Sequence, residues 1–297
     1  MYTVKHAAAL TGIPAATLRM WERRYAVVTP TRTDSGYRVY DEQALQQLSA
    51  MAALVGAGWS PRLAAEHVKS GNSAAPGVTS AGDPRPTEAR DLGDVTALTR
   101  IAVGLDAVGL DALLDEMFSR GTFEEVVEGW VFPALHDLGR SWHAGSVSVA
   151  GEHFVSATVQ RRIASAFDAA RAEPGAPRVL VGLARGSRHE LGALAFATAL
   201  RRVGLDVLYL GGDLPPESWV QTVTLQEPAA VAIAVPASDD VITVRETVAA
   251  LNAAAPALPI YLGGGHQERV GGSAVLLGHS LADAAVELAG QLTVDRP

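Results

Sequence analysis

The sequence predicts a multidomain protein that is α-helical in its first part and α/β in its last part. Between about residues 98 and 171, apolar residues recur at the three- and four-residue spacing of amphipathic helices. From residue 178, short continuous apolar runs alternate with helical segments. A stretch rich in Gly, Pro, Ser and Ala separates the N-terminal segment from the rest, as expected of a flexible linker. We therefore expect domains over residues 1–70, 91–173 and 174–297, with a linker over 71–90.

Charge and composition narrow the class of protein. Of the 297 residues 48% are hydrophobic, and the net charge is −8. Residues 1–75 nevertheless hold eight Lys and Arg against five Asp and Glu, so the positive charge gathers at the end expected to meet phosphate. The absence of cysteine excludes disulfides and thiolate metal sites, which leaves histidine and carboxylates as ligands. No signal peptide and no run of about 18 apolar residues is present, so we expect a cytoplasmic protein without membrane contact.

The N-terminal segment has the pattern of a helix-turn-helix. A first helix is expected near Lys5–Leu10, a turn at Thr11–Gly12 and a second helix near Pro14–Tyr25. In the second helix Leu18 and Trp21 face inward, which leaves a basic outer face that fits a DNA groove, made of Arg19, Arg23 and Arg24.

Residues 30–40 alternate polar and apolar around a glycine-containing turn, as a β-hairpin wing does. Basic groups and tyrosine hydroxyls there are candidate phosphate contacts, namely Arg32, Tyr37, Arg38 and Tyr40. Together with the helix pair this predicts a winged helix-turn-helix that binds double-stranded DNA.

These residues resemble the MerR family of transcriptional regulators. The matching stretches are Leu18–Tyr25, Pro30, Arg32 and Gly36–Tyr40. Ala26 departs from the pattern, because the family has glycine after the tyrosine, so we expect an altered helix end. The resemblance implies a homo-oligomer, dimer or tetramer, on a palindromic operator.

The segment 91–173 contains four amphipathic stretches, and the natural arrangement for them is a four-helix bundle. Near its end, an indole, two imidazoles and a carboxylate lie within twelve residues: Trp142, His143, Glu152 and His153. An indole offers a flat apolar lid and a carboxylate accepts hydrogen bonds from ribose hydroxyls, so the cluster suits a large ligand with a metal centre.

The last segment predicts a Rossmann-like (flavodoxin-like) parallel sheet, because continuous apolar strands separated by helices are covered on both faces. The expected strands are 179–183, 207–210, 230–235, 260–262 and 275–277. Ligands of such sheets bind at the carboxyl ends of the strands. His189 and Gly192 follow the first strand there, and Gly263 and Gly264 follow the fourth.

Together these positions resemble the cobalamin-binding domain. The resemblance implies that His189 binds cobalt from below and that Gly263 and Gly264 line a slot for the displaced nucleotide base. Two departures stand out: Ser187 replaces the Asp that orients the histidine, and Ala234-Val-Pro236 replaces a Ser-x-Leu motif, with Ser238 displaced. Loss of a carboxylate behind a ligand is expected to weaken metal binding about 10- to 100-fold.

The bundle motif resembles the CarH/LitR group of photoreceptors within the MerR family: Trp142, nine intervening residues, then Glu152 and His153. The resemblance implies adenosylcobalamin as cofactor. Trp142 would pack on the adenosyl group, Glu152 and His153 would contact it, and His143 would bind cobalt after the adenosyl group is lost.

The leading interpretation is a light-responsive repressor that binds adenosylcobalamin in the dark, oligomerises on operator DNA and is released by light. An alternative keeps the DNA-binding class but gives the altered sensor another chromophore or corrinoid, or no ligand. A corrinoid methyltransferase or mutase is disfavoured, because the chain has no barrel-sized domain of about 250 residues, so we expect no enzyme. We interpret Asp213 as a turn residue and His266 as a loop residue facing solvent.

Overall fold

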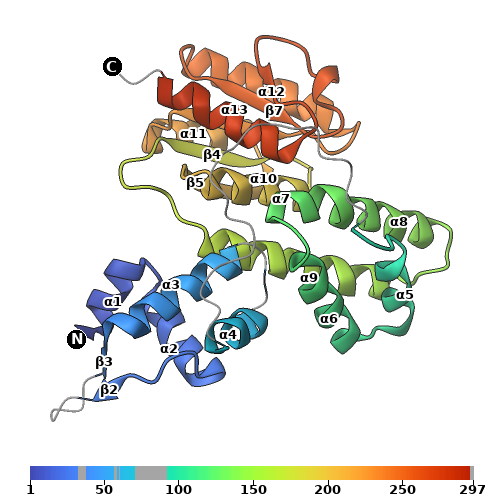
Figure 1. Ribbon diagram of the computed structural model, residues 1–297. Helices are drawn as coiled ribbons and strands as arrows, with labels where there is room; N and C mark the ends of the chain where they lie inside the picture. The colour runs from blue at the N-terminus through green and yellow to red at the C-terminus, as the bar shows by residue number, and fades with distance from the viewer. Residues whose placement is uncertain (33–37, 57–58, 60, 71–91, 295–297) are drawn as a thin grey trace. The chain divides into compact units, whose positions relative to one another are not determined.

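The computed structural model describes residues 1–32, 38–56, 59, 61–70 and 92–294 (Figure 1). It divides into two compact units, Met1–Ala170 and Arg171–Pro297. The expected linker, 71–90, lies outside the described residues, as does Tyr37. Among the helices of the described ranges, none is long and apolar enough to cross a membrane.

The first unit begins with the predicted helix-turn-helix and wing. Helices α1 (Val4–Thr11) and α2 (Ala15–Tyr25) flank a turn in which Gly12 has a φ of +59°. The wing strands β2 (Thr31–Arg32) and β3 (Arg38–Tyr40) pair in antiparallel fashion, and β1 (Tyr2–Thr3) pairs with the other side of β3. Sequence reasoning did not find β1, because two residues carry no periodicity. Helices α3 (Glu42–Gly56) and α4 (Pro61–Lys69) complete the region.

The core of this region forms around α2. Leu18 and Trp21 are buried, as predicted, and pack in one cluster with Leu48 and Met51 of α3. Helix α2 ends at Ala26, which adopts the left-handed conformation with φ +49° and donates its N–H to the carbonyl oxygen of Glu22 at 3.1 Å. The helix therefore ends with the backbone conformation that glycine favours, although alanine costs about 1–2 kcal/mol there.

The four predicted bundle helices are present in the same unit. They are α5 (Ala97–Gly104), α6 (Ala107–Phe118), a continuous helical run over residues 123–143, and α9 (Val149–Ala169). The run consists of α7 (Phe123–Val126), a π-helical turn (Val127–Val131) and α8 (Phe132–His143). Pro133 lacks an N–H at the start of α8, which interrupts the regular ladder where the π turn ends.

The second unit is a five-stranded parallel sheet in the order β5-β4-β6-β7-β8. All five predicted strands are present, as β4 (Arg178–Ala184), β5 (Asp206–Leu214), β6 (Ala230–Ala234), β7 (Ile260–Gly263) and β8 (Val275–Leu276). The multidomain α and α/β fold is thus confirmed.

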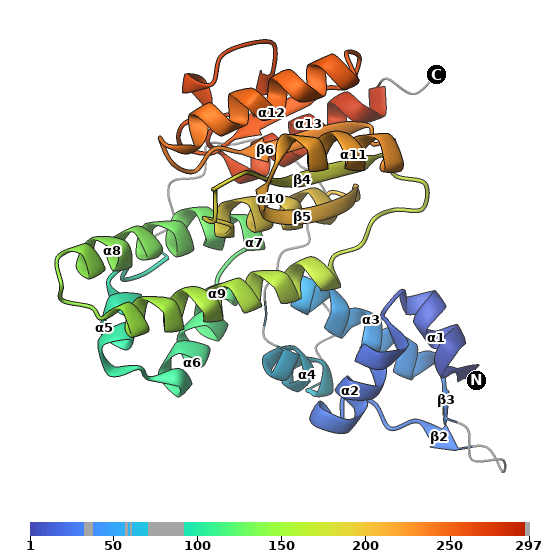
Figure 2. The same ribbon diagram turned by 180° about the vertical axis from the view of Figure 1, so that it is seen from behind.

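Helices cover both faces of this sheet (Figures 1 and 2). Apolar residues of α11 (Pro216–Gln226) and α12 (Asp240–Ala254) share a buried cluster with β4, β6 and β7. Helices α10 (Leu191–Arg202) and α13 (Leu281–Val294) contact each other on the opposite face. Because β4 and β7 are parallel and both pair with β6, their carboxyl ends meet at one edge. The loops that carry His189 and Gly263–Gly265 leave the sheet there.

Candidate functional site

The predicted basic face of α2 is exposed. Arg19, Arg23 and Arg24 all have solvent-accessible side chains on the second helix of the helix-turn-helix. The guanidinium carbon of Arg24 also lies 5.7 Å from the ring centroid of Tyr25. Three exposed guanidiniums on one short helix form a surface that suits phosphates and base edges.

The wing corrects part of the sequence prediction. Tyr40 is only 1% exposed, and its hydroxyl donates to Glu22 Oε2 at 3.3 Å, so in this structure it is a core residue and not a phosphate contact. Burial, more than the charge of Glu22, raises the pKa of this hydroxyl. Arg38 forms an ion pair with Glu22 at 3.0 Å, which raises the pKa of its guanidinium and joins the wing to α2. The side chains of Arg32 and Tyr37 lie outside the described residues.

Trp142 and His143 lie at the carboxyl end of α8. The indole of Trp142 is 39% exposed and meets the imidazole of His143 edge to face, with ring centroids 4.6 Å apart. Nδ1 of His143 lies 2.8 Å from the carbonyl oxygen of Gly139. Because a carbonyl only accepts, Nδ1 carries the proton, and the Nε2 lone pair is free to bind a metal.

Glu152 and His153 lie in the first turn of α9, which follows α8 after the short loop 144–148. His153 Nδ1 and Glu152 Oε2 are 2.6 Å apart, and the hydroxyl of Ser156 donates to Glu152 Oε1 at 2.6 Å. Ser148 caps the helix by accepting from the N–H of Gly151. The carboxylate is therefore held near the helix terminus while the imidazole of His153 stays exposed.

Apolar side chains near this end of the bundle are also exposed. A side chain at Gly151 in α9 would collide with the carbonyl oxygen of Ala102, so the ends of α5 and α9 touch. Nearby, Val103 is 65%, Leu105 51% and Val149 54% exposed. Neighbouring exposed apolar side chains mark a surface that a ligand or another chain covers. This exposure is not apparent from the sequence, because helical periodicity alone assigns an apolar residue such as Leu105 to a core.

In the second unit, His189 lies in the loop after β4 with an exposed ring. Within the described part of the chain, its imidazole has no hydrogen-bond partner. Ser187, two residues earlier, is only 1% exposed, and its hydroxyl oxygen is buried without a partner among the described residues. Gly192, in the first turn of α10, has no atom within 4 Å of the place a Cβ would occupy. The loop thus combines a free imidazole, a buried hydroxyl and open space.

The glycines after β7 differ in what they allow. Gly264 has a φ of +98°, and a Cβ there would lie 2.9 Å from the carbonyl oxygen of Val235, so only glycine fits. A Cβ at Gly265 would meet no atom, and one at Gly263 would make only an ordinary contact with Leu277. The chain therefore turns closely over β6 and then leaves open space at the edge. Gln267 is fully buried and accepts from the Gly278 N–H at 3.2 Å, which fixes the next loop.

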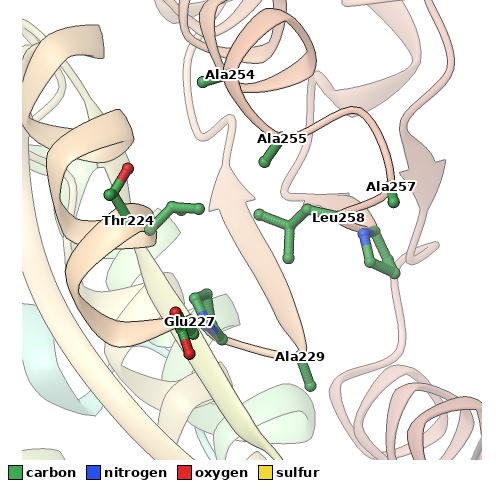
Figure 3. Close-up of a pocket in the computed structure, with 10 residues that line it drawn as sticks. Thr224, Glu227, Ala229, Ala254, Ala255, Ala257 and Leu258 are labelled. Carbon is green, nitrogen blue, oxygen red and sulfur yellow. The ribbon is translucent and has the colours of Figure 1, made fainter.

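A shallow pocket of about 460 Å³ lies elsewhere on this unit (Figure 3). Thr224 and Glu227 line it from the end of α11, Ala254 from the last residue of α12 and Leu258 from the segment that follows. Since β6 begins at Ala230 and β7 at Ile260, the pocket lies at the amino ends of the strands. It is opposite to the edge where ligands of parallel sheets bind.

Comparison with known proteins assigns the family. The family model described as MerR HTH family regulatory protein matches residues 2–70. Two models described as B12 binding domain match residues 95–166 and 177–280. The HTH-type transcriptional repressor CarH of Myxococcus xanthus is 30% identical over 89% of this chain and 88% of its own length. The chain belongs to the MerR-type regulators that carry B12 binding domains.

A second repressor of this family, CarA of Myxococcus xanthus, is 28% identical over 88% of this chain and 85% of its own length. The monomethylamine corrinoid protein of Methanosarcina barkeri aligns with 69% of this chain and all of its own, with a TM-score of 0.53 and 16% identity. That likeness shows the fold of the helical segment and parallel sheet. The family relation supports a corrinoid-binding regulator, and not an enzyme, as the sequence analysis predicted.

Proposed function

We propose that this chain is a light-responsive transcriptional repressor that binds adenosylcobalamin in the dark, oligomerises on double-stranded operator DNA and leaves it after illumination. The observation that carries the proposal is the free imidazole of His189 at the carboxyl edge of a parallel sheet. Two relatives that match over most of their own length are named transcriptional repressors, which supports the same role here.

The residues of the sheet edge fit a corrinoid. His189 would bind the cobalt from below through its exposed ring, and Ser187 supplies a buried hydroxyl whose hydrogen-bonding capacity is unused. Gly192 and Gly263–Gly265 leave room beside them, since Cβ atoms at Gly192 and Gly265 would meet nothing within 4 Å. When bound, adenosylcobalamin supplies a cobalt–carbon bond that light breaks.

The bundle residues are the proposed contacts for the upper side of the cofactor. Trp142 would pack its exposed indole on the adenosyl group, and Glu152 would accept hydrogen bonds from ribose hydroxyls, with His153 beside it. His143 would bind cobalt through Nε2 after illumination, because its Nδ1 already donates to Gly139. If the cofactor stabilises the oligomer only while its adenosyl group is attached, loss of that group on illumination removes the stabilisation, and the oligomer becomes sensitive to light.

Reconstitution in the dark tests the proposal. Protein mixed with adenosylcobalamin is expected to show a corrinoid spectrum, to elute as a larger species and to retard operator DNA, and illumination should reverse the last two. Hydroxocobalamin, which lacks the adenosyl group, is the matched control and should give neither larger species nor retardation. Elution and retardation that stay the same under light would contradict light sensing.

One observation favours a second candidate function. The family's orienting Asp is absent here, and among the residues that the structure describes the hydroxyl of Ser187 has no partner in its place. A MerR-type regulator with a different corrinoid or chromophore, or one acting without ligand, accounts for that change. The absorption spectrum of the protein as first purified distinguishes the candidates, because a bound pigment carries its own bands.

A further inference from the structure

The loop that carries His189 is held by the neighbouring strand β5. Residues Arg185–Glu190 leave β4 through a turn in which Gly186 has a φ of +84°. A long turn with an exposed histidine at its tip presents that ring reproducibly only if other groups fix the backbone. Ser187 does not take over the role of a carboxylate that orients the ring. Its hydroxyl forms no hydrogen bond with any residue that the structure describes.

Asp213, near the end of β5, makes three contacts with this loop. Its Oδ1 accepts from the Gly186 N–H at 2.8 Å, and its Oδ2 accepts from the Arg188 guanidinium at 3.3 Å. Its own N–H donates to the carbonyl oxygen of Ser187 at 2.9 Å. The left-handed φ of +60° at Asp213 lets main chain and side chain face the loop together.

The surroundings of Asp213 favour the same close approach. A Cβ at Gly212 would lie 2.7 Å from the carbonyl oxygen of Ser187, so glycine is needed for β5 to come this near. On the other side of His189, the Tyr209 hydroxyl donates to Glu190 Oε2 at 3.0 Å. Both sequence neighbours of His189 are therefore bound to β5, Arg188 through Asp213 and Glu190 through Tyr209.

The two partners of Asp213 are not equal. The Gly186 N–H is the larger cause of the lowered pKa of this carboxyl, and the guanidinium of Arg188 comes second. Arg188 is 81% exposed, and exposed ion pairs contribute little. The hydrogen bond to the Gly186 N–H holds the loop more firmly, because its donor is a backbone group and not the end of a long, exposed side chain.

We propose that Asp213 is a positioning residue that holds the loop of His189 in the geometry needed to bind cobalt, through its hydrogen bond to the Gly186 N–H. The proposal rests on the proposed function, since it takes His189 as the lower ligand. It differs from the expected arrangement, because Asp213 comes from the next strand and acts on the backbone of the loop, without touching the imidazole.

Three variants test it. Asp213→Gly removes the carboxylate but tolerates the left-handed backbone. Asp213→Asn keeps an oxygen that accepts from the Gly186 N–H. Glu227→Gly is the matched control, because Glu227 is also left-handed, with a φ of +44°, but lies at the amino edge of the sheet. Thermal unfolding of each variant confirms that it is folded.

The first readout is hydrogen exchange of the peptide containing Gly186 in protein without cobalamin. We expect faster exchange in Asp213→Gly, with protection restored in Asp213→Asn and unchanged in Glu227→Gly. Exchange in Asp213→Gly that equals the wild-type rate would overturn the proposal.

The second readout is the nitrogen ligand of bound Co(II) cobalamin, seen by electron paramagnetic resonance. In protein with 15N-labelled histidine, we expect the histidine-ligated share to fall in Asp213→Gly and the dissociation constant to rise about 10-fold, as for other groups that orient a metal ligand. Asp213→Asn should recover most of the signal, and its failure to do so would also overturn the proposal. A wild-type protein without a histidine signal would instead refute the proposed lower ligand, whatever the variants do.

Discussion

The two segments that carry the proposed cobalt ligands are held in different ways. The loop of His189 is bound by the neighbouring strand, through Asp213 on one side and Tyr209 on the other. His143 is held by its own helix, through the carbonyl of Gly139 and contact with Trp142. The first histidine depends on tertiary structure, whereas the second depends on one turn of helix.

This difference suggests a division of roles. A ligand on a rigid sheet edge is ready before the cofactor arrives, which lowers the ordering cost of binding. A histidine at a helix end, beside a half-exposed indole, changes position without disturbing a core. We therefore expect substitutions near His189 to change both the stability of the fold and the affinity for cobalamin. Substitutions at the end of α8 should change the affinity for cobalamin and leave the stability of the fold nearly unchanged.

The largest expected effect is a difference in stability between substitutions of two tryptophans in the helical run 123–143. Trp130 is fully buried in the π turn and donates its indole N–H to the carbonyl oxygen of Asp94 at 3.2 Å, so Trp130→Ala should destabilise the bundle by about 3–5 kcal/mol. Trp142→Ala should cost less than about 1 kcal/mol, because its indole is already half in solvent. Urea unfolding measures both. A large loss of stability in Trp142→Ala would show that the end of α8 is structural.

Two adjacent glycines give a smaller effect at the sheet edge. Gly264→Ala should cost about 2 kcal/mol, since the residue is left-handed and its Cβ would press on the Val235 carbonyl. Gly265→Ala should change stability by less than about 0.5 kcal/mol, because its Cβ would meet no protein atom. It should nevertheless weaken cobalamin binding, because the Cβ would occupy space proposed for the cofactor. Thermal unfolding and spectroscopic titration separate the two quantities. Equal stability of the two variants would contradict the conclusion that the fold requires glycine at position 264.

The smallest expected effect is a pH-dependent difference in stability at Asp94. Hydrogen bonds from Arg100 and Thr96 lower the pKa of Asp94 to about 2, whereas that of Asp213 is lowered chiefly by a backbone N–H. A carboxyl with a lowered pKa in the folded state stabilises the fold above its ordinary pKa, and the contribution is lost as pH falls from about 4 towards 2. Asp94→Asn should therefore be slightly less stable than wild type at pH 7, with the gap closing over that range. Thermal unfolding at several pH values measures the gap, and a constant gap would refute the assignment.

Much of the fold followed from periodicity and turn chemistry. The helix pair, the wing, four bundle helices and five strands were predicted, because each carries several apolar residues at a fixed spacing. The strand Tyr2–Thr3 and the π turn were not, since one is too short and the other depends on how Pro133 meets a buried helix.

Motif spacing led to the proposed site residues, but not to the contacts that hold them in place. Motif spacing identified His189 and Trp142, whereas Asp213 was interpreted as a plain turn residue. Its contact with Gly186 joins two residues 27 positions apart in the sequence, which no local pattern reveals. Tyr40 was misassigned for a related reason, because its burial depends on Glu22 from another element.

The most direct test of the central claim is which atom binds the cobalt from below. Protein containing 15N-labelled histidine, reconstituted with Co(II) cobalamin, is compared with unlabelled protein by electron paramagnetic resonance. The account predicts that the nitrogen splitting changes with the label, and that this label-dependent splitting disappears in His189→Ala. A splitting that ignores the label in the wild-type protein, or a label-dependent splitting that survives in His189→Ala, would contradict binding through His189.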